Sequence, residues 1–73
     1  MENNKIIFLD VKTVPAFDSE SLSCHTAYTV FTYRNGLFQY ATGWTLQDAI
    51  ESYSVAHNCE RYSLRLKRPF RPQ

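Results

Sequence analysis

The sequence predicts a small α+β fold, in which one helix packs on one face of an antiparallel sheet of three to four strands. Three observations predict it: the Asn35-Gly36 pair between two β-forming runs, an amphipathic segment after Thr45, and strict alternation of apolar and polar residues from Tyr62 to Lys67. The order is a ββαβ core with an additional N-terminal strand. Seventy-three residues, 44% of them hydrophobic, suit a single domain spanning residues 1–73.

The N-terminal part contains one β-forming run followed by a polar stretch. Residues 5–11 read Lys-Ile-Ile-Phe-Leu-Asp-Val and predict the additional strand. Residues 12–25 contain Pro15 and the run Asp-Ser-Glu-Ser at 18–21. Proline and clustered small polar residues are typical of connections, so we expect residues 12–25 to form the longest loop.

The strongest local signal is Asn35-Gly36. Both residues tolerate the positive φ that a type I′ turn requires, so the pair predicts a two-residue hairpin in which Arg34 faces Leu37. Side-chain alternation then gathers one set of residues on each face of the hairpin. One face holds Phe31, Tyr33, Phe38 and Tyr40, and the other holds Thr32, Arg34 and Gln39. We expect the aromatic set to line the core and the polar set to face water.

The segment after Thr45 has the signals of a helix. Thr45 with Asp48 three residues later forms the Ser/Thr-x-x-acid pattern that satisfies free backbone donors at a helix start. Apolar residues then recur at three- and four-residue spacing, at Leu46, Ala49, Ile50, Tyr53 and Ala56. Asn58 is the expected end, because asparagine accepts the left-handed conformation that closes many helices.

The last strand is expected over residues 61–67. Tyr62, Leu64 and Leu66 would point toward the helix, and Arg65 and Lys67 would emerge on the open face beside Arg34. Pro69 and Pro72 prevent further sheet pairing, so residues 68–73 are expected to be an extended tail.

Charge is unevenly distributed along the chain. The last thirteen residues hold five cations and no acid, whereas the first sixty hold three cations and seven acids. The protein therefore combines an acidic body with a basic end, and such a field steers acidic partners toward that end. The residues expected to bind a partner are Arg34, Arg65, Lys67, Arg68 and Arg71.

Catalytic, metal and cofactor signals are incomplete. Cys24 and His25 are sequence neighbours, which point to opposite faces of a strand, and no third orienting group is evident. Neither this pair nor His57 with Cys59 has zinc-knuckle spacing, and the chain's two glycines do not form a phosphate loop. We expect a non-enzymatic protein without metal or cofactor. Two cysteines, expected to be reduced, and no long apolar run predict a cytoplasmic protein without a membrane partner.

Two segments resemble a known family. The run Thr-Leu-Gln-Asp-Ala-Ile-Glu at 45–51, followed by Arg-Leu-Lys-Arg-Pro at 65–69, resembles small bacteriophage proteins that inhibit host RNA polymerase. Proteins of that family place a helix across a small sheet and insert a basic strand into the negatively charged DNA channel of the polymerase. The resemblance implies that Arg65 and Lys67 correspond to the family's pair of strand arginines, and that the protein acts in a bacterial host cell.

Two functional hypotheses follow. The first is a non-catalytic inhibitor, encoded by a phage or mobile element, that inserts basic residues into an acidic or nucleic-acid-binding site of a bacterial host complex such as RNA polymerase. The alternative is a module that binds DNA or RNA directly through its open sheet face. Self-pairing of the strand at residues 5–11 is a further possibility, so the sequence leaves both monomer and homodimer open.

Overall fold

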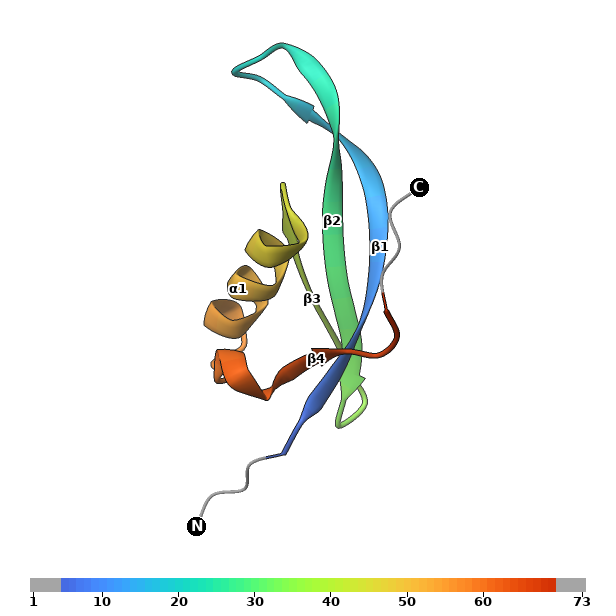
Figure 1. Ribbon diagram of the computed structural model, residues 1–73, viewed down its shortest axis with the longest axis vertical. Helices are drawn as coiled ribbons and strands as arrows, with labels where there is room; N and C mark the ends of the chain where they lie inside the picture. The colour runs from blue at the N-terminus through green and yellow to red at the C-terminus, as the bar shows by residue number, and fades with distance from the viewer. Residues whose placement is uncertain (1–4, 70–73) are drawn as a thin grey trace.

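The computed structural model describes residues 5–69 and consists of a four-stranded sheet with one helix on one face (Figure 1). The elements in chain order are β1 (Ile7–Asp18), β2 (Ser23–Arg34), β3 (Leu37–Gly43), α1 (Leu46–Ala56), the 3₁₀ turn η1 (Arg61–Ser63) and β4 (Leu64–Leu66). The strands lie in the order β3-β2-β1-β4. The predicted small α+β class is therefore confirmed.

The sheet is mixed, although the sequence predicted an antiparallel one. β1 pairs antiparallel with β2, and β2 pairs antiparallel with β3. β4 pairs parallel with β1, with Ile7 opposite Leu64 and Leu9 opposite Leu66. The parallel pairing is possible because the chain crosses from the β3 edge to the β1 edge through α1, the kind of crossover that parallel strands require.

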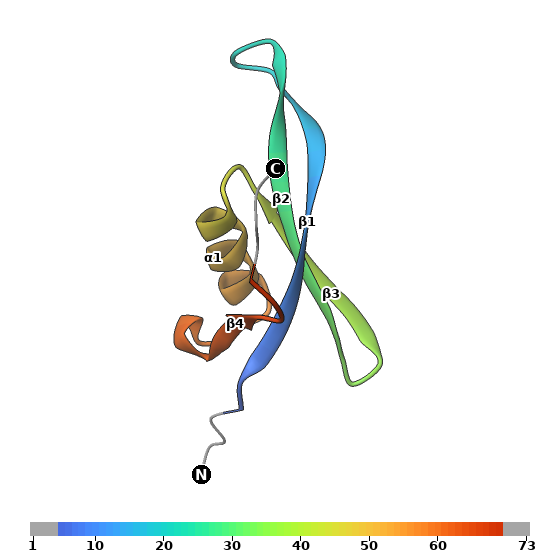
Figure 2. The same cartoon turned by 45° about the vertical axis from the view of Figure 1, so that its right-hand side comes forward.

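The predicted loop over residues 12–25 is wrong. β1 and β2 stay paired from Asp10 opposite Phe31 to Asp18 opposite Ser23, so only a four-residue turn remains between them. Pro15 is accommodated because β4 pairs only with the beginning of β1, which leaves this part of β1 at a sheet edge. The distal part of this hairpin projects past the N-terminal end of α1 (Figures 1 and 2).

The Asn35-Gly36 hairpin is confirmed. Asn35 has φ 53° and Gly36 has φ 80°, the positive values that a type I′ turn needs at both positions. The register follows the prediction, with Arg34 opposite Leu37 and Tyr33 opposite Phe38. This turn therefore fixes which side chains share a face of β2 and β3.

The helix also begins and ends where its signals predict. The Thr45 side chain accepts a hydrogen bond from the Asp48 backbone N–H at 3.0 Å. α1 ends at Ala56, and Asn58 follows in the left-handed region with φ 55°.

The predicted strand over residues 61–67 is shorter, because residues 61–63 form η1. Tyr62 is consequently 65% exposed and does not pack under the helix.

The core lies on the face of the sheet that was expected to be wet. Its buried residues are Leu9, Val30, Ala41, Ala49, Ile50, Tyr53 and Leu64. In β2 and β3 the covered face is that of Val30 and Ala41, so the prediction of an aromatic core wall is wrong. A close approach explains the choice: a Cβ added to Gly43 would lie 2.5 Å from the Ala49 backbone nitrogen. Only a face of small residues admits the helix at this distance.

Polar side chains at the end of this face bond to the helix and the segment after it. The Tyr53 hydroxyl donates to Gln39 Oε1 at 2.9 Å, and Arg34 Nη1 donates to Cys59 Sγ at 3.2 Å. Gln39 and Arg34 were expected on the open face, so that assignment is wrong. Burial raises the pKa of Tyr53, and the Arg34 guanidinium partly opposes the shift.

Replacing Tyr53 by Phe tests this buried hydroxyl. Because the folded pKa of Tyr53 is raised above the unfolded value of about 10, its neutral form stabilises the fold below that pH, and this contribution is lost as pH rises further. Tyr53→Phe should cost about 0.5–1.5 kcal/mol at neutral pH through the lost hydrogen bond, and should make the alkaline fall in stability shallower. Urea unfolding across pH measures both effects. Tyr62→Phe is the control, and an alkaline slope left unchanged by Tyr53→Phe contradicts the assignment.

Candidate binding surface

The face of the sheet opposite α1 carries a cluster of aromatic rings, which we call the aromatic face. It consists of Phe31, Tyr33, Phe38 and Tyr40. Tyr33 is 69% exposed, Tyr40 57% and Phe38 51%, so the rings present broad surfaces to water. Apolar surface gathered in this way marks a site of interaction on a small protein.

The rings form one connected group centred on Phe38. Its ring centroid lies 5.2 Å from Tyr33, 5.7 Å from Tyr40 and 6.0 Å from Phe31, and it stacks on Tyr40 at 25°. The hairpin register produces this arrangement, because it places Tyr33 opposite Phe38 and Phe31 opposite Tyr40 on one face. The cluster is therefore held by the backbone pairing and by ring contacts, without a covering element among residues 5–69.

Cations border the aromatic face on the β1 and β4 side. Alternation with the buried Leu9 places Asp10 and Lys12 of β1 on this face, and Lys67 reaches Asp10 with an Nζ to Oδ2 distance of 3.1 Å. The Lys67 side chain is 50% exposed in this ion pair, so it still meets solvent. A surface pair of this kind contributes about 1 kcal/mol or less, which leaves Lys67 available to an anionic ligand.

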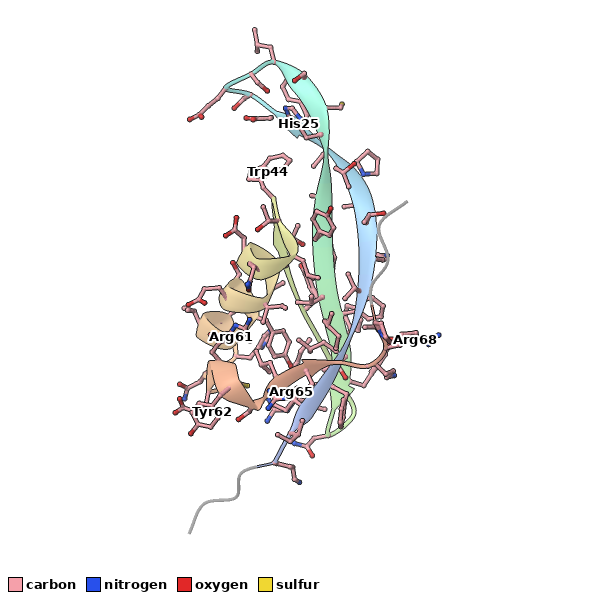
Figure 3. The ribbon with its side chains drawn as sticks, viewed as in Figure 1. His25, Trp44, Arg61, Tyr62, Arg65 and Arg68 are labelled. Carbon is pink, nitrogen blue, oxygen red and sulfur yellow. The ribbon has the colours of Figure 1, made fainter. Side chains whose placement is uncertain are left out.

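The structure separates the residues predicted to bind a partner. Arg65 lies on the exposed side of β4, but its Nη1 atom donates to the backbone carbonyl oxygens of Tyr62 at 2.6 Å and Leu64 at 3.0 Å. Arg68 is exposed and points away from α1 (Figure 3). Arg34 lies on the helix side, so its predicted convergence with Arg65 and Lys67 is wrong. Arg71 and the end of the predicted tail lie outside the described residues.

A second polar cluster lies near the turn of the distal hairpin. His25 Nε2 is 3.0 Å from the Ser21 hydroxyl and 3.1 Å from the Ser23 hydroxyl, and the His25 ring meets Trp44 edge-on at 6.0 Å (Figure 3). The Asp18 carboxylate accepts the Glu20 backbone N–H at 3.0 Å and so serves the turn. The described residues show no hydrogen bond from the His25 ring to a carboxylate, the orienting contact that a serine nucleophile and its base require.

Metal-ligating and membrane-spanning features were sought in the same part of the chain. Residues 5–69 contain no group of three or more His, Cys, Asp or Glu side chains placed to hold a metal ion. Cys24 and Cys59 are both free thiols. No helix within the described range has the length and apolar character needed to cross a membrane.

The chain matches no known family model, no curated protein and no solved structure. The resemblance of residues 45–51 and 65–69 to phage inhibitors of RNA polymerase therefore stays a prediction. The class of site is defined by its geometry: an uncovered sheet face with clustered aromatic rings and cations along one border. Sequence alternation identified which residues share this face, but it placed them in the core.

Substitutions on the two faces should differ sharply in their effect on stability. Tyr33→Thr removes an exposed ring and should cost less than about 1 kcal/mol, the scale of one cross-strand pair. Ile50→Ala opens the core under α1 and should cost about 2–5 kcal/mol. Urea unfolding of both variants measures the contrast. A larger cost for Tyr33→Thr than for Ile50→Ala would show that the aromatic face is the packed one.

Proposed function

We propose that this protein is a non-catalytic binding protein whose aromatic face binds single-stranded nucleic acid. The observation that supports it is the cluster of rings around Phe38, exposed on a sheet face that no described element covers. Unpaired bases stack on such rings, and each stacked base contributes about 1–3 kcal/mol. Duplex DNA buries its base faces in its own stack, so this surface favours single strands.

The distribution of charge supports the same ligand. Three cations follow the exposed side of β1 and β4: Lys12 on β1, Arg65 on β4 and Lys67 directly after β4. Asp10 is the acid between them, and it is already paired with Lys67. The other acids of the described chain lie elsewhere. Asp18 and Glu20 are at the distal turn, Asp48 and Glu51 are on α1, and Glu60 precedes η1. A phosphate backbone along the aromatic face would therefore meet cations first, although the body of the chain is acidic.

Fluorescence anisotropy with a labelled single strand of about twelve nucleotides tests this proposal. Phe38→Ser removes the central ring and should weaken binding by about 1–3 kcal/mol, or 5- to 150-fold. If Lys12, Arg65 and Lys67 each neutralise one phosphate, log K should fall with log salt concentration with a slope of about −2.

Tyr62→Ser is the matched control, because Tyr62 is an exposed aromatic residue that lies on η1, outside the aromatic face. It should leave the affinity unchanged. The proposal fails if the wild-type protein does not bind the single strand at low salt, or if Phe38→Ser binds as well as Tyr62→Ser does.

An inhibitor of a bacterial host complex is the second candidate. It is favoured by the exposure of Arg65, Lys67 and Arg68. The resemblance aligns two of them, Arg65 and Lys67, with the pair of arginines on a polymerase-binding strand. This function would use the basic residues in place of the rings. In binding assays with bacterial RNA polymerase, Arg65→Glu combined with Lys67→Glu would then abolish association, whereas Phe38→Ser would retain it. The reverse pattern excludes this candidate.

A further inference from the structure

A hollow of about 370 Å³ lies on the open face of the sheet, beside the aromatic rings. It is lined by Lys12 of β1, Thr29 and Phe31 of β2, and Phe38, Tyr40 and Thr42 of β3. This volume falls within the range of small-ligand sites, about 300–1,000 Å³. The hollow is therefore large enough to receive one base with its sugar.

The strand register arranges these residues in two rows. Lys12 lies opposite Thr29, and Thr29 lies opposite Thr42, so three polar side chains cross the sheet in one line. Phe31 and Tyr40 face each other in the adjacent row of the same face. Because rows on one face are about 7 Å apart, a flat ring stacked on the aromatic row would direct its edge to the polar row.

The polar row can present two sets of hydrogen-bonding groups, depending on which threonine donates. The Thr29 and Thr42 hydroxyl oxygens are 3.1 Å apart, so one donates to the other. When Thr29 donates to Thr42, Thr42 keeps a proton for a ligand and Thr29 keeps lone pairs that accept. The Lys12 ammonium only donates, and it has no ion-pair partner among residues 5–69. The row Lys12, Thr29, Thr42 then presents a donor, an acceptor and a donor. When Thr42 donates to Thr29 instead, the row presents a donor, a donor and an acceptor.

The geometry points to a recognition site for a single pyrimidine base. The pairing edge of uracil or thymine carries a carbonyl oxygen, an N–H group and a second carbonyl oxygen, which complement the first arrangement in that order. The carbonyl oxygen, ring nitrogen and amino group of cytosine complement the second arrangement in that order. Adenine has no carbonyl oxygen, and the protons of its amino group cannot be accepted by Lys12. This inference rests on the proposed binding of single strands and names the class of base that the surface selects.

Replacing both threonines by valine tests the site, because valine keeps the branched shape, removes both hydroxyls and favours strands. Affinities of the wild type and of the Thr29→Val, Thr42→Val variant are measured for oligothymidylate and oligodeoxyadenylate of equal length. The wild type should prefer oligothymidylate. The double variant should lose about tenfold of this preference while keeping its affinity for oligodeoxyadenylate. Comparing the ratio of the two affinities between the wild type and the double variant cancels any general effect of oligonucleotide flexibility.

Thr13→Val is the matched control, since Thr13 is exposed on β1 and does not line the hollow. It should retain the wild-type preference. The inference is overturned if the wild type binds both strands equally, if the double variant keeps its preference, or if it weakens for both strands alike. In each of these cases binding persists in the wild type, so the proposed function stands. Failure of the wild type to bind either strand removes the proposed function and this inference together.

Discussion

The close approach of α1 to β3 determines how the rest of the molecule is arranged. The helix backbone at Ala49 lies so near Gly43 that the strand position has no room for a side chain. Ala41 on the same strand is buried against the helix as well. Because this contact requires small residues on the facing strand, it selects one face of the hairpin for burial and leaves the other face uncovered.

The rest of the core is small and comes from three strands and the helix. Leu9, Val30 and Leu64 come from three strands and meet Ile50 and Tyr53 of the helix. Tyr53 is the largest fully buried side chain, and its hydroxyl is satisfied by Gln39 at 2.9 Å. The imidazole of His57 adds a contact from the end of the helix to the Tyr40 backbone carbonyl at 3.2 Å. Packing thus depends on one face alone, and the rings on the other face are free to contact a ligand.

Local signals made part of the fold predictable from the sequence. Asn35-Gly36 specifies its own turn, and Thr45 with Asp48 specifies the helix start, because each signal acts within four residues. Alternation correctly grouped Phe31 with Tyr33, but it does not state which group is buried. The large apolar side chains of the aromatic group favoured its burial in the sequence-based prediction. In the structure, the small residues Ala41 and Gly43 determine which face the helix covers.

Non-local pairing explains the remaining differences. Residues 12–25 contain turn-forming residues, yet β1 and β2 continue as a hairpin because each supplies the other's backbone hydrogen bonds. Arg34 was assigned to the basic surface because the wrong face of the hairpin was expected to be buried. The residues that share a face with Arg34 were predicted correctly. The hollow lined by Lys12 and the two threonines was not predicted either. Lys12 was expected in a loop, and the face that carries the two threonines was expected to be buried.

Nuclear Overhauser effects between α1 and the sheet test the placement of the helix most directly. The structure predicts effects from the side chains of Ile50 and Tyr53 to the methyl groups of Val30 and Ala41, and none from Ile50 to the ring of Phe38. Cross-peaks joining Ile50 to the rings of Phe38 and Tyr33, with none to Ala41, would place the helix over the aromatic rings and contradict the account.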